Sequence, residues 1–169
     1  MPLIRLFLDI CLFRKGPQDV PASMMLLRFA LAAYFLVGVA LTVLEAPWLE
    51  GIAQVLLEAA MLLAFVWVSL LAAGKTSRWL QTLISMLGTD ALISGVAIPL
   101  EALLLVNPQA SVVHLILLLL MLWHLGVVAH ILRHALSQTL AVGLGLAIVY
   151  VAFSVQVLVM LFGAPTASG

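Results

Sequence analysis

Apolar residues along this chain come in long uninterrupted runs, and polar residues gather in the short stretches between them. A transmembrane helix needs about 20 consecutive apolar residues, and five runs reach that length. Alternating strands of about ten residues, which mark an outer-membrane barrel, are not the pattern here. The sequence therefore predicts an all-α, polytopic membrane bundle with five transmembrane helices, at about residues 23–44, 52–73, 80–106, 112–135 and 140–162.

Breaker residues divide these runs. Residues 14–22 contain one glycine and two prolines, and Ser23 is suited to cap the helix that follows. Pro99 lies inside the third run, where we expect it to kink or end the helix. Residues 1–22 are thus predicted to form an interfacial helix and loop, residues 23–163 the five-span bundle, and residues 164–169 a disordered tail.

The N-terminal run, residues 3–13, is too short to span a membrane. Arg5 and Asp9 are one helical turn apart, so their charges share a narrow stripe on an otherwise apolar helix. The sequence predicts an amphipathic helix that lies in the cytoplasmic membrane interface with this stripe toward water. A short helix packed against the bundle fits the same pattern equally well.

The basic residues give the expected orientation. With five spans, every Lys and Arg falls on one side of the membrane: Arg5, Arg14, Lys15, Arg28, Lys75, Arg78 and Arg133. Positively charged loops remain in the cytoplasm. We therefore expect a bacterial inner-membrane protein with its N-terminus in the cytoplasm and its C-terminus outside.

Composition agrees with this class: 66% of the residues are hydrophobic, 8% are charged, and the mean hydropathy is +1.30. Soluble domains carry about 25% charged residues. The net charge is zero, which argues against a nucleic-acid partner. A single cysteine, Cys11, excludes an intramolecular disulfide.

Asp90 lies near the middle of the third predicted span, where a carboxylate costs about 2.5–3.5 kcal/mol. At 1.5 Å per residue, His124 and Tyr150 lie at a similar depth in the fourth and fifth spans, so they are its predicted partners. Glu58 lies closer to the outer end of the second span. These four residues form the candidate intramembrane polar layer, which either joins helices by hydrogen bonds or serves as a proton relay or substrate contact.

Other motifs carry less information. His130 and His134 share a helix face with zinc-ligand spacing, but no third ligand accompanies them, so we expect titrating interfacial histidines and no metal. We predict no cofactor and no catalytic residue. Gly143 and Ala147 form a small-x3-small pattern that permits close helix approach. Beyond the lipid bilayer, the expected partners are other membrane proteins or a second copy of this chain on such a face.

Two stretches, GKTSRWLQTLISMLGTDALISGVAIPL and WHLGVVAHILRHALSQTLAVGLGLAIVYV, resemble the Yip-domain family of small membrane proteins. The first is similar to that family's Gly-Lys loop entering a span with small residues and a later proline. The second is similar to its Trp-initiated half-span, basic connection and Gly/Ala-rich final span. The resemblance covers roughly residues 52–162, and it implies a five-span fold and a link to vesicle traffic in eukaryotic members.

Three functions remain open at this point. The preferred interpretation is a non-enzymatic scaffold or assembly factor of Yip-like architecture. The alternative is a small transporter or proton-coupled permease subunit that works through the polar layer. A membrane-embedded enzyme acting on a lipid is the third.

Overall fold

Five of the six α-helices are long and apolar enough to cross a membrane. The computed structural model describes residues 2–44 and 46–163, and the predicted disordered tail lies outside them. Within the described residues the chain is helical, with no strand. The helices are α1 (Pro2–Cys11), α2 (Met24–Thr42), α3 (Trp48–Ala72), α4 (Trp79–Val106), α5 (Ser111–Leu136) and α6 (Leu140–Phe162), and the 3-10 turns are η1 (Pro17–Asp19) and η2 (Thr76–Arg78). The chain is therefore a polytopic, all-α integral membrane protein.

Helix ends follow the local sequence closely. The Ser23 side chain accepts a hydrogen bond from the backbone N–H of Leu26, which confirms the predicted cap of α2. Thr139 caps α6 in the same way, and Ser137 ends α5 in the left-handed conformation. The prediction for Pro99 was wrong where it allowed the helix to end, because α4 continues through this residue to Val106.

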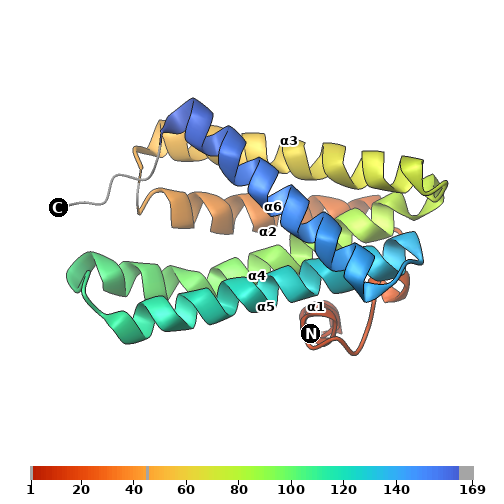
Figure 1. Ribbon diagram of the computed structural model, residues 1–169, viewed down its shortest axis with the longest axis horizontal. Helices are drawn as coiled ribbons and strands as arrows, with labels where there is room; N and C mark the ends of the chain where they lie inside the picture. The colour runs from red at the N-terminus through yellow and green to blue at the C-terminus, as the bar shows by residue number, and fades with distance from the viewer. Residues whose placement is uncertain (1, 45, 164–169) are drawn as a thin grey trace.

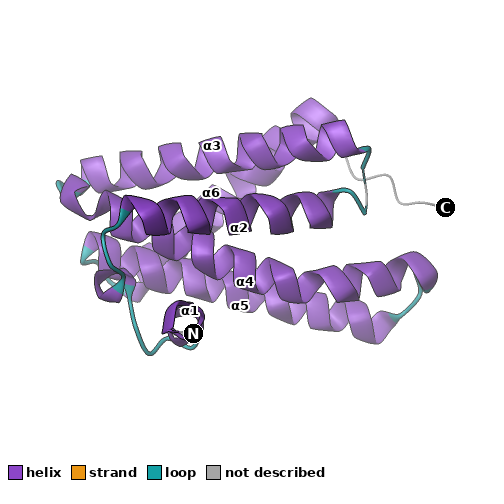
Figure 2. Ribbon diagram, turned by 180° about the vertical axis from the view of Figure 1, so that it is seen from behind, coloured by secondary structure: helices purple, strands orange, loops and turns teal. Residues whose placement is uncertain are grey.

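The long helices form two pairs and a crossing helix (Figure 1). Helices α2 and α3 lie side by side, α4 and α5 form a second antiparallel pair, and α6 crosses obliquely from the end of α5 toward α3. We call the end with the α3–α4 and α5–α6 connections the basic end, because the Lys and Arg residues lie toward it, and the opposite end the far end. The reverse view in Figure 2 shows the two pairs separating toward the far end.

Helix α1 packs across α4 and α5 near the basic end, and both views show it end-on (Figures 1 and 2). Phe7, Ile10 and Cys11 are buried by this contact. The indole N–H of Trp123 donates to the Cys11 carbonyl at 3.0 Å. The sequence left two arrangements open for this helix, and the structure shows α1 packed against the bundle. The side of α1 that faces away from the bundle exposes apolar residues such as Leu8.

A close helix contact holds α6 on α5. Gly143 and Ala147 are both buried, and a Cβ atom at Gly143 would collide with the backbone carbonyl oxygen of Ala129. The small-x3-small pattern therefore brings two helices of the same chain together. This face is occupied within the molecule.

Candidate functional site

The site begins where the enclosed part of α4 ends. Residues 82–89 of α4 are all buried, and so are residues 127–132 of α5. Toward the far end α5 exposes most of its residues, and most residues of α4 are partly exposed. Asp90 and His124 lie directly at this boundary, between a section enclosed by protein and a section that is open on one side.

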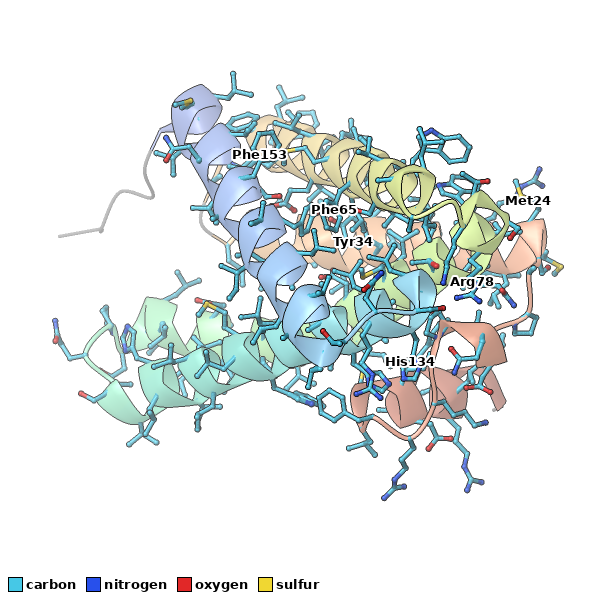
Figure 3. All side chains as sticks on the ribbon, turned by 45° about the vertical axis from the view of Figure 1, so that its right-hand side comes forward. Met24, Tyr34, Phe65, Arg78, His134 and Phe153 are labelled. Carbon is cyan, nitrogen blue, oxygen red and sulfur yellow. The ribbon has the colours of Figure 1, made fainter. Side chains whose placement is uncertain are left out.

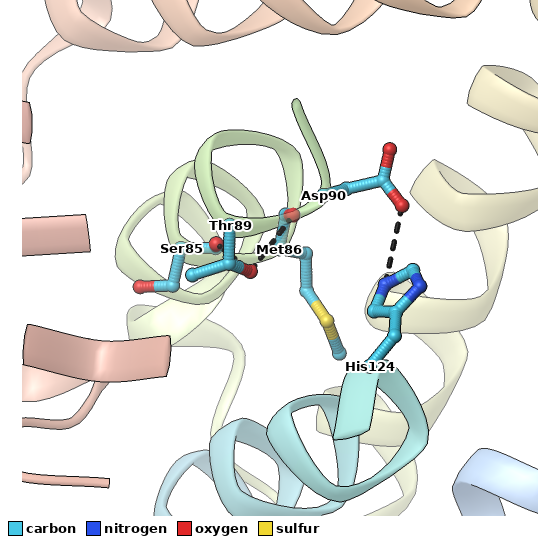
Figure 4. Close-up of polar contacts among 5 residues, drawn as sticks. All are labelled: Ser85, Met86, Thr89, Asp90 and His124. Atoms are coloured by element: carbon cyan, nitrogen blue, oxygen red, sulfur yellow. Dashed lines mark hydrogen bonds and ion pairs between the residues drawn. The ribbon is translucent and has the colours of Figure 1, made fainter. Parts of the chain in front are cut away.

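Asp90 and His124 are in contact across the α4–α5 pair (Figure 4). A carboxylate oxygen of Asp90 lies 3.2 Å from Nε2 of His124, and their side chains are 26% and 31% exposed. The Ser94 hydroxyl, one turn further along α4, lies close to the Asp90 carboxylate. The structure thus contains the contact that equal depth in two spans predicted.

In the turns of α4 that precede Asp90, the side-chain hydroxyls donate hydrogen bonds to backbone carbonyls of the same helix. Thr89 donates its hydroxyl proton to the Ser85 carbonyl at 2.8 Å, with Met86 as a second acceptor at 3.2 Å. Ser85 in turn donates to the Gln81 carbonyl at 2.7 Å. Because these hydroxyls are satisfied by their own helix, the buried part of α4 leaves no polar demand on α5 from Ser85 or Thr89.

Three further polar side chains surround the pair from the other helices. Tyr34 of α2, Glu58 of α3 and Tyr150 of α6 all lie within electrostatic range of Asp90. Tyr150 was a predicted direct partner of Asp90, but its ring stacks on Phe65 of α3 with centroids 4.6 Å apart. Tyr150 therefore joins α6 to α3 beside the pair.

Tyr34 is the member of this cluster that the sequence reasoning missed. It is 7% exposed and belongs to the hydrophobic core against which Phe65 also packs; both residues are labelled in Figure 3. Counting at 1.5 Å per residue places it about 15 Å into α2 from the basic end, close to the depth of Asp90 in α4. The same depth count that selected Tyr150 would have found it.

A groove of about 370 Å³ runs from the pair toward the far end between α4 and α5. His124 closes its inner end, and Ser94 and Glu101 are its other polar residues. Its remaining lining is apolar: Ile93, Ala97, Leu117, Leu118, Leu120 and Met121. Glu101 lines this groove from the far-end part of α4.

The other two histidines near the basic end have structural partners. Nε2 of His130 is hydrogen-bonded to the Lys15 carbonyl at 2.9 Å, and its ring meets that of His134 edge to face at 4.6 Å. Arg78 donates to the His134 and Ala135 carbonyls, both at 3.1 Å, and so caps the end of α5 (Figure 3). Among the described residues, no group of three His, Cys, Asp or Glu side chains is arranged to hold a metal ion.

A carboxylate and an imidazole at this separation can share one proton. Charged groups within a span are costly unless they are paired or face a polar cavity, and the contact between Asp90 and His124 meets the first condition. Protonation of either partner changes the net charge of the pair, so it can take up or release a proton in response to its surroundings. The geometry is therefore suited to proton binding inside the membrane.

No family model, curated protein or solved structure matches this chain.

Proposed function

We propose that this integral membrane protein is a small proton-coupled permease, or a subunit of one, whose proton-binding site is the Asp90–His124 pair. The observation that carries the proposal is the 3.2 Å contact between a carboxylate and an imidazole within two spans. Such groups inside a span are rare and commonly belong to ion or proton pathways.

The surroundings of the pair support this role. Tyr34, Glu58 and Tyr150, on three other helices, lie within electrostatic range of Asp90. The groove beside His124 connects the pair with the far end. We propose further that the basic end lies in the cytoplasm of a bacterial cell, with the C-terminus outside, because every Lys and Arg lies toward that end.

The second candidate function is a non-enzymatic scaffold or assembly factor of Yip-like architecture. Helix α6 favours it, because most of its side chains face outward and only Gly143 and Ala147 are buried. Exposed side chains such as Phe153 and Met160 offer a surface for helices of another membrane protein. A scaffold would use this surface and would not require Asp90 to exchange protons.

Proton flux in liposomes separates the two candidates. The purified protein is reconstituted with a pH-sensitive dye trapped inside, and a potassium diffusion potential drives proton entry. Asp90→Asn keeps the size and hydrogen-bonding capacity of the side chain but cannot release a proton. We expect this variant to reduce flux to the level of protein-free liposomes.

The matched control is Glu50→Gln, which removes a carboxylate at the far end that accepts a hydrogen bond from the Gln54 side-chain amide of the same helix. This variant should retain wild-type flux. If wild-type liposomes are no more permeable to protons than empty ones, or if Asp90→Asn leaves flux unchanged, the permease proposal is wrong.

A further inference from the structure

The groove between α4 and α5 has an unusual charge environment. All seven Lys and Arg residues belong to the basic end. Glu101 of α4 lines the groove instead, Asp90 of α4 contacts His124 at its inner end, and Glu58 of α3 lies within electrostatic range of Asp90. His124 is the one basic side chain that lines the groove, and Asp90 pairs with it. The site therefore favours positive charge.

The size and lining of the groove define the rest of the ligand. Its volume of about 370 Å³ falls within the range of small-molecule sites. Six of its nine lining residues are apolar, and Ser94, Glu101 and His124 supply the polar contacts. A strongly hydrated inorganic ion would leave the apolar wall uncovered, whereas an amine or onium ion with apolar substituents would use both parts of the surface.

We infer that this groove is a binding site for a lipophilic monovalent cation, which enters from the far end and reaches the Asp90–His124 pair. This inference rests on the proposed function and names the substrate class of the same site. The cation places its charge near Glu101 and Asp90, and its apolar groups lie against residues such as Leu117 and Met121. A proton on the pair and a cation in the groove compete for the same negative charge.

A pair of probes with equal shape and opposite charge tests the inference directly. Tetraphenylphosphonium and tetraphenylborate differ chiefly in the sign of their charge. Equilibrium dialysis with the purified full-length protein in detergent should detect saturable binding of the phosphonium and at least about tenfold weaker binding of the borate.

Two variants, each with a matched control variant, locate the binding site. Glu101→Gln should weaken phosphonium binding at least about tenfold, whereas Glu50→Gln, outside the groove, should leave it unchanged. Ala97→Phe fills the groove and should abolish binding. Val96→Phe, the adjacent position on α4 with 54% exposure, points away from the groove and should bind like the wild type. Circular dichroism and gel filtration establish that each variant is folded.

The outcomes separate this inference from the proposed function. Equal binding of both probes would show an apolar groove that accepts any lipophilic molecule, and the inference would be overturned. Loss of binding in Val96→Phe together with Ala97→Phe would also overturn it, because the site would then lie elsewhere. Phosphonium binding with the expected variant pattern supports the inference even if liposomes show no proton flux, and that result would sink the permease proposal alone.

Discussion

The basic-end halves of α4 and α5 are enclosed by protein, whereas the far-end half of α5 is largely exposed and that of α4 is only partly covered. The enclosed halves are the more polar ones. All four buried polar side chains of the described residues lie there, namely Thr82, Ser85, Thr89 and His130. The exposed halves consist mainly of leucine and other apolar residues, such as Leu103, Leu118 and Leu122.

In soluble proteins the buried parts are the more apolar ones, and here the enclosed halves are the more polar ones. Lipid tails are as apolar as leucine, so burying a leucine between helices gains little from the hydrophobic effect. Small and hydroxyl-bearing residues permit close backbone approach and can bond their own helix, which favours protein contact. In α4, polarity and small size therefore predict burial better than hydrophobicity does.

The largest expected effect comes from the closest contact of the enclosed half. Gly143→Val would place side-chain atoms against the Ala129 carbonyl oxygen, and a backbone atom of a packed helix has no room to move aside. We expect a loss of about 3 kcal/mol or more in the free energy of unfolding. Denaturation by sodium dodecyl sulfate, followed by circular dichroism, measures this loss. Gly145→Val, with no atom within 4 Å of its added Cβ, is the matched control and should change little.

A pair of leucines in one helix tests the comparison itself. Leu87 is fully buried in the enclosed half of α4, and Leu103 is 47% exposed in the other half. Leu87→Ala should cost about 2–3 kcal/mol, because it leaves a cavity among packed side chains. Leu103→Ala should cost under about 0.5 kcal/mol, because lipid fills the space. The same denaturation assay measures both, and equal losses would show that the two halves are covered alike.

The smallest expected effect concerns the docking of α1 on α4 and α5. It appears as a slow labelling rate of Cys11, and at neutral pH it involves no change in stability. Burial raises the pKa of the Cys11 thiol from 9.0 to about 11, so its reactive thiolate is about a hundredfold scarcer than in a free cysteine at neutral pH. A maleimide should label Cys11 far more slowly than it labels a cysteine introduced at Leu12, which is 50% exposed, in a Cys11→Ala background.

The pH dependence of stability provides a second measurement of the same contact. Because the thiol ionises at lower pH in the unfolded chain, stability should be unaffected below pH 9 and should fall as the pH rises toward 11. Cys11→Ala should remove this part of the pH dependence. Similar labelling rates for Cys11 and the introduced cysteine would mean that α1 is not held on α4 and α5.

The sequence predicted the helices well, because span length and breaker residues are local properties. The last span begins and ends where the polar pattern indicated, at residues 140–162. The second begins at Trp48 rather than at residue 52, because Pro47 is already suited to start a helix and the residues after it join the first turn. Pro99 misled the reading of α4, since a proline inside a membrane helix does not have to end it.

For the candidate site, the sequence predicted how deep each polar residue lies in its span but not which way its side chain points. Depth follows from counting residues along each span, and this brought Asp90 and His124 to the same level, where they are in contact. Direction around the helix depends on how each helix is rotated by its neighbours. Tyr150 has the right depth, but its ring stacks on Phe65, while Tyr34 and Glu101 join the site from positions to which no role in it was assigned.

The sequence alone therefore determined the solvent, the number of spans and the level of the polar residues, because these depend on length, hydropathy and the rise of an α-helix. The tertiary structure decided which faces meet. It placed α1 on the bundle, used Gly143 for an internal contact, and separated the helix pairs toward the far end. These choices depend on side-chain packing between distant segments, since apolar helices of similar composition are equally soluble in lipid whichever face they present.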